Sequence, residues 1–125
     1  TTTHDLPTLA GFVEGRDIEA RRAAGLVDQA EYEQQWSVRR DEIVRLEDAL
    51  QRAGFAGDPL GFVLATPCVL AIINQEDLTG AAEQQNLPAS TWQHPNWRRK
   101  MKVALEDLAP IAEDLRRRLE RSGRV

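Results

Sequence analysis

The feature that most constrains the fold is a short, continuously apolar run, CVLAII, at residues 68–73. Pro67 and the polar residues NQED bound it, and half of its members are β-branched. Such a run is typical of a strand covered on both faces, as in a parallel sheet, with a buried turn of helix as the alternative. A lone strand leaves backbone groups unpaired, so either this run is helical or its partner strands lie outside the sequence. The threonines at 1–3 favour the second reading, because they look like the end of another strand.

Three helices are predicted ahead of this run, over residues 17–24, 28–53 and 60–65. The second has the strongest signals, because Asp28 and Glu31 have the spacing of a capping box. Apolar side chains then recur at helical intervals, at Tyr32, Trp36, Ile43, Leu46, Leu50 and Ala53. Gly54 is placed to end this helix in the left-handed conformation.

The two shorter helices rest on their end signals. Asp17 is the predicted N-cap of the first, and Gly25 marks its end. Asp58 and Pro59 are a favoured N-cap and first helical residue for the other, and Pro67 stops it.

The C-terminal part divides into a loop and a helical region. Residues 74–96 are polar and aperiodic, so they are predicted to form a long loop of the kind that often carries function. A helical region is predicted from Asn96 onward, with a second apolar stripe and an end near Gly123. Pro110 lies inside that stripe and is expected to kink or split the helix.

Composition excludes several classes of function. The length of 125 residues suits one domain, and a net charge of −4 argues against nucleic-acid binding. The single cysteine, Cys68, permits no intrachain disulfide, and its apolar neighbours predict a buried, inert thiol. No apolar run is long enough to span a membrane, and a signal-peptide pattern is lacking, so a cytoplasmic protein is expected. Neither a glycine-rich phosphate loop nor a metal-ligand pattern is present, so we expect no cofactor and no metal.

Polar side chains follow both predicted strands. His4 and Asp5 come after the threonine run, and the NQED residues 74–77 come after the apolar run. The carboxyl ends of parallel strands meet at one edge, where α/β enzymes carry their active sites, so these residues are expected to share one site. On composition alone, a solvated pair at His4 and Asp5 and a turn at Asp77 are the alternatives.

Four motifs, in order along the chain, resemble the C-terminal part of bacterial 4-α-glucanotransferases, also called amylomaltases or disproportionating enzymes. They are THDLPTLAGFVEGRD (3–17), NQEDLTG (74–80), EQQNLPAS (83–90) and HPNWRRKM (94–101). The resemblance implies an α/β fold in which residues 1–125 form the C-terminal segment of a (β/α)8 TIM barrel. Thr1–Thr3 would end the seventh strand and residues 68–73 would form the eighth, with flanking helices that make the isolated piece predominantly helical.

The resemblance also implies an activity, the transfer of α-1,4-glucan segments between sugar acceptors with retention and without an organic cofactor. Asp5 matches the aspartate that stabilises the oxocarbenium-like transition state, a role that suits an ionised carboxylate. The implied substrate-binding residues are His4, Gln75, Asp77, Gln85 and Asn86. The nucleophile and the acid/base would come from the missing N-terminal part of the barrel, so the fragment is expected to be inactive alone. Its partners would be maltooligosaccharides and that missing part.

Two points qualify the resemblance. The loop reads NLPAS where the family leads us to expect Gly-Thr after the proline, so Ala89 puts the loop geometry in question. Asn96 and Trp97 match a motif that we interpret as mainly structural. The alternative function is an independent helical module that binds a partner helix through a face bearing Trp36 and Trp97.

Overall fold

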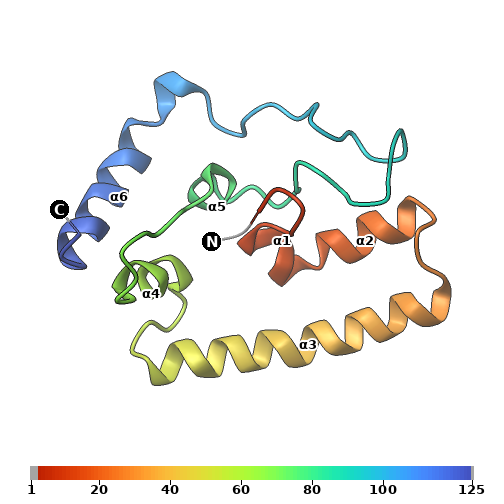
Figure 1. Ribbon diagram of the computed structural model, residues 1–125, viewed down its shortest axis with the longest axis horizontal. Helices are drawn as coiled ribbons and strands as arrows, with labels where there is room; N and C mark the ends of the chain where they lie inside the picture. The colour runs from red at the N-terminus through yellow and green to blue at the C-terminus, as the bar shows by residue number, and fades with distance from the viewer. Residues whose placement is uncertain (1–2, 125) are drawn as a thin grey trace.

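The computed structural model describes residues 3–124, and all the regular structure in that range is helical. The elements are α1 (Leu9–Glu14), α2 (Arg16–Ala23), α3 (Gln29–Arg52), α4 (Pro59–Ala65), α5 (Gln75–Thr79), the 3-10 turn η1 (Leu105–Asp107) and α6 (Ala109–Arg121). Helix α3 runs along one side of the molecule with α1 and α2 above it, while α4 and α6 lie together at the end remote from α2 (Figure 1). This confirms the prediction of a predominantly helical piece. Threonines 1 and 2, predicted to belong to a strand, lie outside the described residues.

Helix α3 forms where its end signals predicted it. The Asp28 carboxylate accepts from the backbone N–H of Glu31, and the Glu31 carboxylate accepts from that of Asp28, both at 2.9 Å. The reciprocal pair satisfies two N–H groups that have no partner inside the helix. Beyond the other end, Gly54 takes the left-handed conformation with φ of 80°, so the capping box and the terminator are confirmed.

Helix α4 is likewise confirmed, with Pro59 in its first turn and Ala65 as its last residue. Asp58 is its N-cap, and its carboxylate accepts from the N–H of Gly61 at 3.0 Å.

The start of α2 differs from the prediction. The helix begins at Arg16 with Gly15 as its N-cap, so the prediction of Asp17 as N-cap is wrong. Asp17 lies inside the first turn, and its carboxylate is buried against Arg39 of α3. A bidentate pair with a guanidinium is stronger than a single capping bond, which explains the outcome.

The Asp17–Arg39 pair joins the three N-terminal helices. The two terminal nitrogens of Arg39 each donate to one Asp17 oxygen at 2.8 Å. One of them also donates to the carbonyl of Phe12 at 2.8 Å, and the guanidinium lies 4.1 Å from the centroid of the Phe12 ring. The hydrogen bonds with Asp17 raise the pKa of Arg39, and both side chains of the pair are buried.

Two glycines allow close packing around this junction. The ring of Trp36 on α3 covers Gly15 so closely that a Cβ atom there would collide with it, and Gly15 also needs its positive φ of 68°. A Cβ at Gly11 would collide with the carbonyl oxygen of Ala82, so the loop after α5 rests directly on the α1 backbone.

The sequence analysis missed two short helices and misplaced the start of the last one. Helix α5 lies inside the predicted 74–96 loop, and no helix was predicted for α1. The prediction of a helix from Asn96 onward is wrong, because α6 starts only at Ala109. Pro110 sits in the first turn of α6 and neither kinks nor splits it, because a missing N–H is harmless there.

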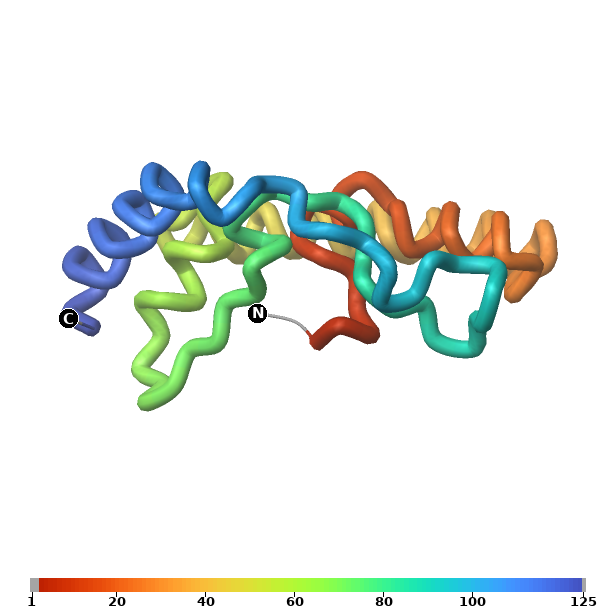
Figure 2. The backbone as a smooth tube through the Cα atoms, turned by 90° about the horizontal axis from the view of Figure 1, so that it is seen from above, coloured from red at the N-terminus to blue at the C-terminus, as the bar shows by residue number. Residues whose placement is uncertain are grey.

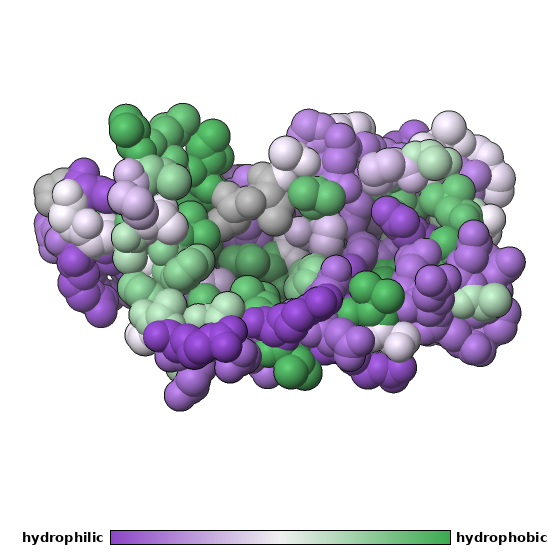
Figure 3. Space-filling view, turned by 60° about the horizontal axis from the view of Figure 1, so that its bottom comes forward, coloured by the Kyte–Doolittle hydropathy of each residue, from purple (hydrophilic) through white to green (hydrophobic). Residues whose placement is uncertain are grey.

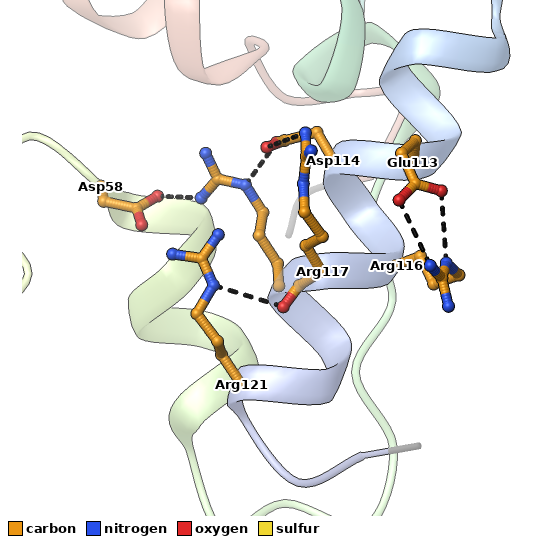
Figure 4. Close-up of polar contacts among 7 residues, drawn as sticks. Asp58, Glu113, Asp114, Arg116, Arg117 and Arg121 are labelled. Atoms are coloured by element: carbon orange, nitrogen blue, oxygen red, sulfur yellow. Dashed lines mark hydrogen bonds and ion pairs between the residues drawn. The ribbon is translucent and has the colours of Figure 1, made fainter.

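Helix α6 is held on α4 by charged side chains (Figure 4). Arg118 donates to Asp58, the α4 N-cap, at 2.5 Å and to Asp114 on its own helix at 2.7 Å. The bond from Arg118 lowers the pKa of Asp114. Arg124 donates to the carbonyls of Leu64 and Thr66 at 2.6 and 2.9 Å. Both ends of α4 are therefore fixed by the C-terminal segment.

Residues 68–73 form neither the predicted strand nor a helix, and the predicted burial of Cys68 is wrong. The segment has no regular structure and bends at Val69, and it projects from the helices on the same side as the turn at residues 3–7 (Figure 2). It gives the hydrophobic projection at the upper left of the space-filling view (Figure 3), with exposed side chains at Val69, Leu70 and Ile72. A strand needs a partner, and between residues 3 and 124 none is formed.

The core is small for a chain of this mass. Its buried apolar residues are Ile18, Leu50, Leu64 and Leu87. The accessible surface is 8254 Å², against about 6,700 Å² for a folded monomer of this size. Much apolar surface is therefore uncovered. Within residues 3–124, no helix combines the length and hydrophobicity needed to cross a bilayer.

We expect Arg39→Met to lower the free energy of unfolding by about 3 kcal/mol or more, because it leaves the buried Asp17 carboxylate unpaired. Urea unfolding followed by circular dichroism measures the change. Arg40→Met, at the exposed neighbouring position, is the control and should alter stability by less than about 0.5 kcal/mol. Equal losses in the two variants would contradict the central role of the pair.

Candidate functional site

The N-terminal turn and the loop after α5 meet through Asp5 and Asn86. The Asn86 side-chain amide donates to the Asp5 carboxylate at 2.6 Å, and its backbone N–H donates to the carbonyl of His4 at 3.3 Å. The side-chain contact joins residues that lie 81 positions apart in the sequence. The structure therefore brings together three of the predicted site residues.

His4 lies between Asp5 and an aromatic side chain. Its Nε2 is 3.5 Å from the Asp5 carboxylate, and its ring centroid is 4.7 Å from that of Trp97, with the planes tilted by 59°. The side chains of His4 and Asp5 are 55% and 49% exposed, so a ligand in solution can reach both.

Gln85 connects this cluster to α5. Its side-chain amide donates to the carboxylate of Glu76 at 3.1 Å, and its carbonyl accepts from the backbone N–H of Trp97 at 3.0 Å. A hollow of about 300 Å³ lies beside these groups, lined by Thr3, His4, Leu6, Thr8, Asn74, Glu76, Gln84 and Gln85. Most of this lining is polar and belongs to the predicted motifs.

Gln75 and Asp77 flank Glu76 in the sequence but make other contacts than its pair with Gln85. Asp77 is buried, and its carboxylate accepts from the N–H of Leu9, the first residue of α1, at 2.7 Å. It therefore holds the start of α1, whose N-terminal N–H groups have no partner inside the helix. Gln75 opens α5 and lines a second hollow of about 530 Å³ with Arg99 and Lys102.

The loop that carries Asn86 is fixed from within. The Asn96 side chain accepts from the N–H of Leu87 at 2.8 Å and donates to the Ser90 hydroxyl at 2.9 Å. The Ser90 N–H donates to the Leu87 carbonyl at 3.1 Å, across Pro88 and a left-handed Ala89 with φ of 65°. This is the pattern of a type II turn, which prefers glycine where Ala89 stands.

The cluster suits a ligand rich in hydroxyl groups. A carboxylate accepts hydrogen bonds, side-chain amides donate and accept, and a hydroxyl does both. Within residues 3–124, no three His, Cys, Asp or Glu side chains gather closely enough to hold a metal ion.

Sequence reasoning missed two members of the cluster. Glu76 was part of a noted polar run, but only the fold pairs it with Gln85. Trp97 was interpreted as structural, and nothing in the motif HPNW reveals that its ring lies against His4. Trp36 and Trp97 make separate contacts, with Gly15 and His4 respectively.

Comparison with known proteins assigns residues 1–108 to a glycoside hydrolase family 77 model, described as 4-alpha-glucanotransferase. Curated relatives include the 4-alpha-glucanotransferases of Mycobacterium bovis and of two strains of Mycobacterium tuberculosis. Each is 32% identical over 109 residues, which cover 78% of this chain and 15% of the relative. The chain thus spans a small part of these proteins, and the family resemblance of the four motifs is confirmed.

We expect Asp77→Ala to lower the free energy of unfolding by about 1–3 kcal/mol, because it removes a buried acceptor from the start of α1. Asp5→Ala should cost less than about 1 kcal/mol, since its exposed amide partner regains water. Thermal and urea unfolding of the two variants, compared side by side, measures the difference. A larger loss of stability for Asp5→Ala than for Asp77→Ala would contradict the prediction that Asp77, and not Asp5, stabilises the fold.

We expect Ala89→Gly to raise the free energy of unfolding by about 0.5–1 kcal/mol. Glycine removes the strain of the left-handed conformation in the folded state, and this gain exceeds the stabilisation of the unfolded chain by the added conformational entropy of glycine. Ala49→Gly, inside α3, is the control of opposite sign and should destabilise by about 0.5–1 kcal/mol. Destabilisation by Ala89→Gly, measured in the same urea titration, would show that the turn is not strained.

Proposed function

This chain belongs to the 4-alpha-glucanotransferase family, and on that basis we propose that it supplies one wall of the active site of such an enzyme. The parent enzyme would transfer α-1,4-glucan segments between maltooligosaccharide acceptors with retention. The observation that carries the proposal is the contact of His4, Asp5 and Asn86, from two of the family's motifs, at one exposed site.

Asp5 is proposed to stabilise the transition state. Its carboxylate is held by the Asn86 amide yet remains half exposed, so it is available to the hydroxyls of a bound sugar. Hydrogen bonds to a hydroxyl beside the reacting carbon strengthen as positive charge develops there. Preorganisation by Asn86 means that the carboxylate does not have to reorient during the reaction.

His4, Gln85 and Asn86 are proposed to bind the substrate around Asp5, and Gln75 to extend the site along α5. Asp77 is proposed to act indirectly, as a positioning residue. By holding the start of α1, it fixes the turn that carries His4 and Asp5.

Residues 68–73 are proposed to become the eighth strand of a (β/α)8 barrel, with residues 1–3 ending the seventh. The exposed apolar side chains of Val69, Leu70 and Ile72 support this, because neighbouring strands and helices would cover them. The partner in this proposal is the rest of the same barrel, and a cytoplasmic location goes with it.

Bond cleavage is proposed to depend on that partner. A retaining mechanism needs a nucleophile and an acid/base about 5–5.5 Å apart. Asp5 is neither, so the isolated chain is expected to transfer no sugar. The residues of this chain are proposed to hold and orient the substrate while positive charge develops at the reacting carbon.

The test is a chimera in which residues 1–108 replace the matching segment of the Mycobacterium tuberculosis relative. We expect the chimera to disproportionate maltotriose and release glucose. Asp5→Asn in the chimera should lower kcat by about 10²-fold or more, because the ionised acceptor is lost.

Asp41→Asn, on an exposed part of α3, is the control and should leave kcat unchanged. Melting temperatures of the chimera variants separate loss of catalysis from loss of folding. A chimera that folds and keeps full activity with Asp5→Asn would refute the assigned role, and glucose release by purified residues 1–125 would refute the dependence on a partner.

A further inference from the structure

Trp97 has a backbone conformation that bulky residues rarely adopt. Its φ is 60°, in the left-handed region, where large L side chains are strained. Its N–H donates to the Gln85 carbonyl at 3.0 Å, and the following N–H, of Arg98, donates to Pro95 at 3.1 Å. The backbone on both sides therefore enforces the strained conformation.

Burial of the ring does not explain this strain. Trp97 is 62% exposed, whereas Trp36 is packed over Gly15. The only ring contact of Trp97 within residues 3–124 is the tilted one with His4. A strained residue whose side chain is presented to solvent indicates a functional constraint.

The surroundings of the ring identify the chemistry of a ligand. The His4 ring lies against the indole, and the Asp5 carboxylate lies 3.5 Å from His4 Nε2 and accepts from the Asn86 amide. Trp97, His4 and Asp5 are exposed, and Asn86 is half-buried. A sugar ring has a C–H face that packs on an aromatic surface and a rim of hydroxyls that hydrogen-bond to carboxylates and amides. The cluster offers both kinds of surface side by side.

We propose that the Trp97 indole is a stacking platform for a glucose unit of the α-glucan bound at Asp5. This inference rests on the proposed function and adds to it a residue that binds substrate directly. The strained backbone turns the ring out beside His4, and the sugar would cover the aromatic surface that the fold leaves exposed.

Titration of the ¹⁵N-labelled 125-residue chain with maltotriose, followed by NMR, tests the inference, because chemical shifts report even millimolar binding. We expect the indole N–H signal of Trp97 to move together with the backbone signals of Asp5 and Asn86. The indole signals of Trp36 and Trp92 are internal controls and should stay fixed; Trp92 is exposed in the same segment.

The outcomes separate this inference from the proposed function. Movement of Asp5 and Asn86 without Trp97 would overturn the platform and leave the proposed site intact. No movement at any of the three would overturn the platform, while the chimera assay would still decide the function. Equal movement of all three indole signals would mark nonspecific binding and also overturn it.

Two variants distinguish the ring from its backbone. Trp97→Asn keeps a residue that tolerates positive φ, so it should fold at least as stably while its affinity for maltotriose falls about five- to tenfold. Trp97→Phe keeps an aromatic face and should retain most of the affinity. In His4→Ala the Trp97 signal should still move, because the ring itself meets the sugar. Unchanged affinity in Trp97→Asn would refute the proposal.

Discussion

The buried ion pair between Asp17 and Arg39 is the interaction on which the rest of the structure depends. It fixes α2 on α3, and the same guanidinium reaches the Phe12 carbonyl, so α1 is held as well. Few apolar side chains are fully buried, so packing alone does not define how these helices cross. A bidentate pair with a set geometry does, because any other arrangement leaves a buried charge unpaired. The turn bearing His4 and Asp5 precedes α1 directly and takes its position from this junction.

A second set of polar contacts joins α1 to α5 and to the chain that follows α5. Asp77 binds the first N–H of α1, and the hydroxyl of Thr8, the α1 N-cap, donates to the Ala81 carbonyl at 2.6 Å. Together they lock α5 and the chain after it onto α1, with Gly11 permitting the close approach. The loop of Asn86 then returns to Asp5. Helix termini, which always have unpaired N–H groups, thus serve here as the points of attachment.

The sequence allowed prediction of those elements whose signals are local. The capping box of α3 and the Asp58-Pro59 start of α4 depend on neighbouring residues, and both formed as expected. Helices α1 and α5 are too short to show periodicity. Asp17 was misassigned because its partner lies 22 residues away and no local pattern reveals it. The site residues at 4, 5, 85 and 86 came from family motifs, whereas the pairing of Trp97 with His4 required coordinates.

Residues 68–73 show most clearly what a sequence pattern encodes and what it leaves open. The run has the composition of a covered strand, yet its side chains face solvent, because a strand is stable only with partners. Both of its ends are nevertheless held. Arg118 and Arg124 fix α4 before it, and α5 after it is fixed on α1 through Asp77. Six residues span at most about 20 Å, so the segment is a short connection between two anchored helices. The helices at its two ends therefore restrict the conformations of this uncovered segment, although its own side chains pack against little.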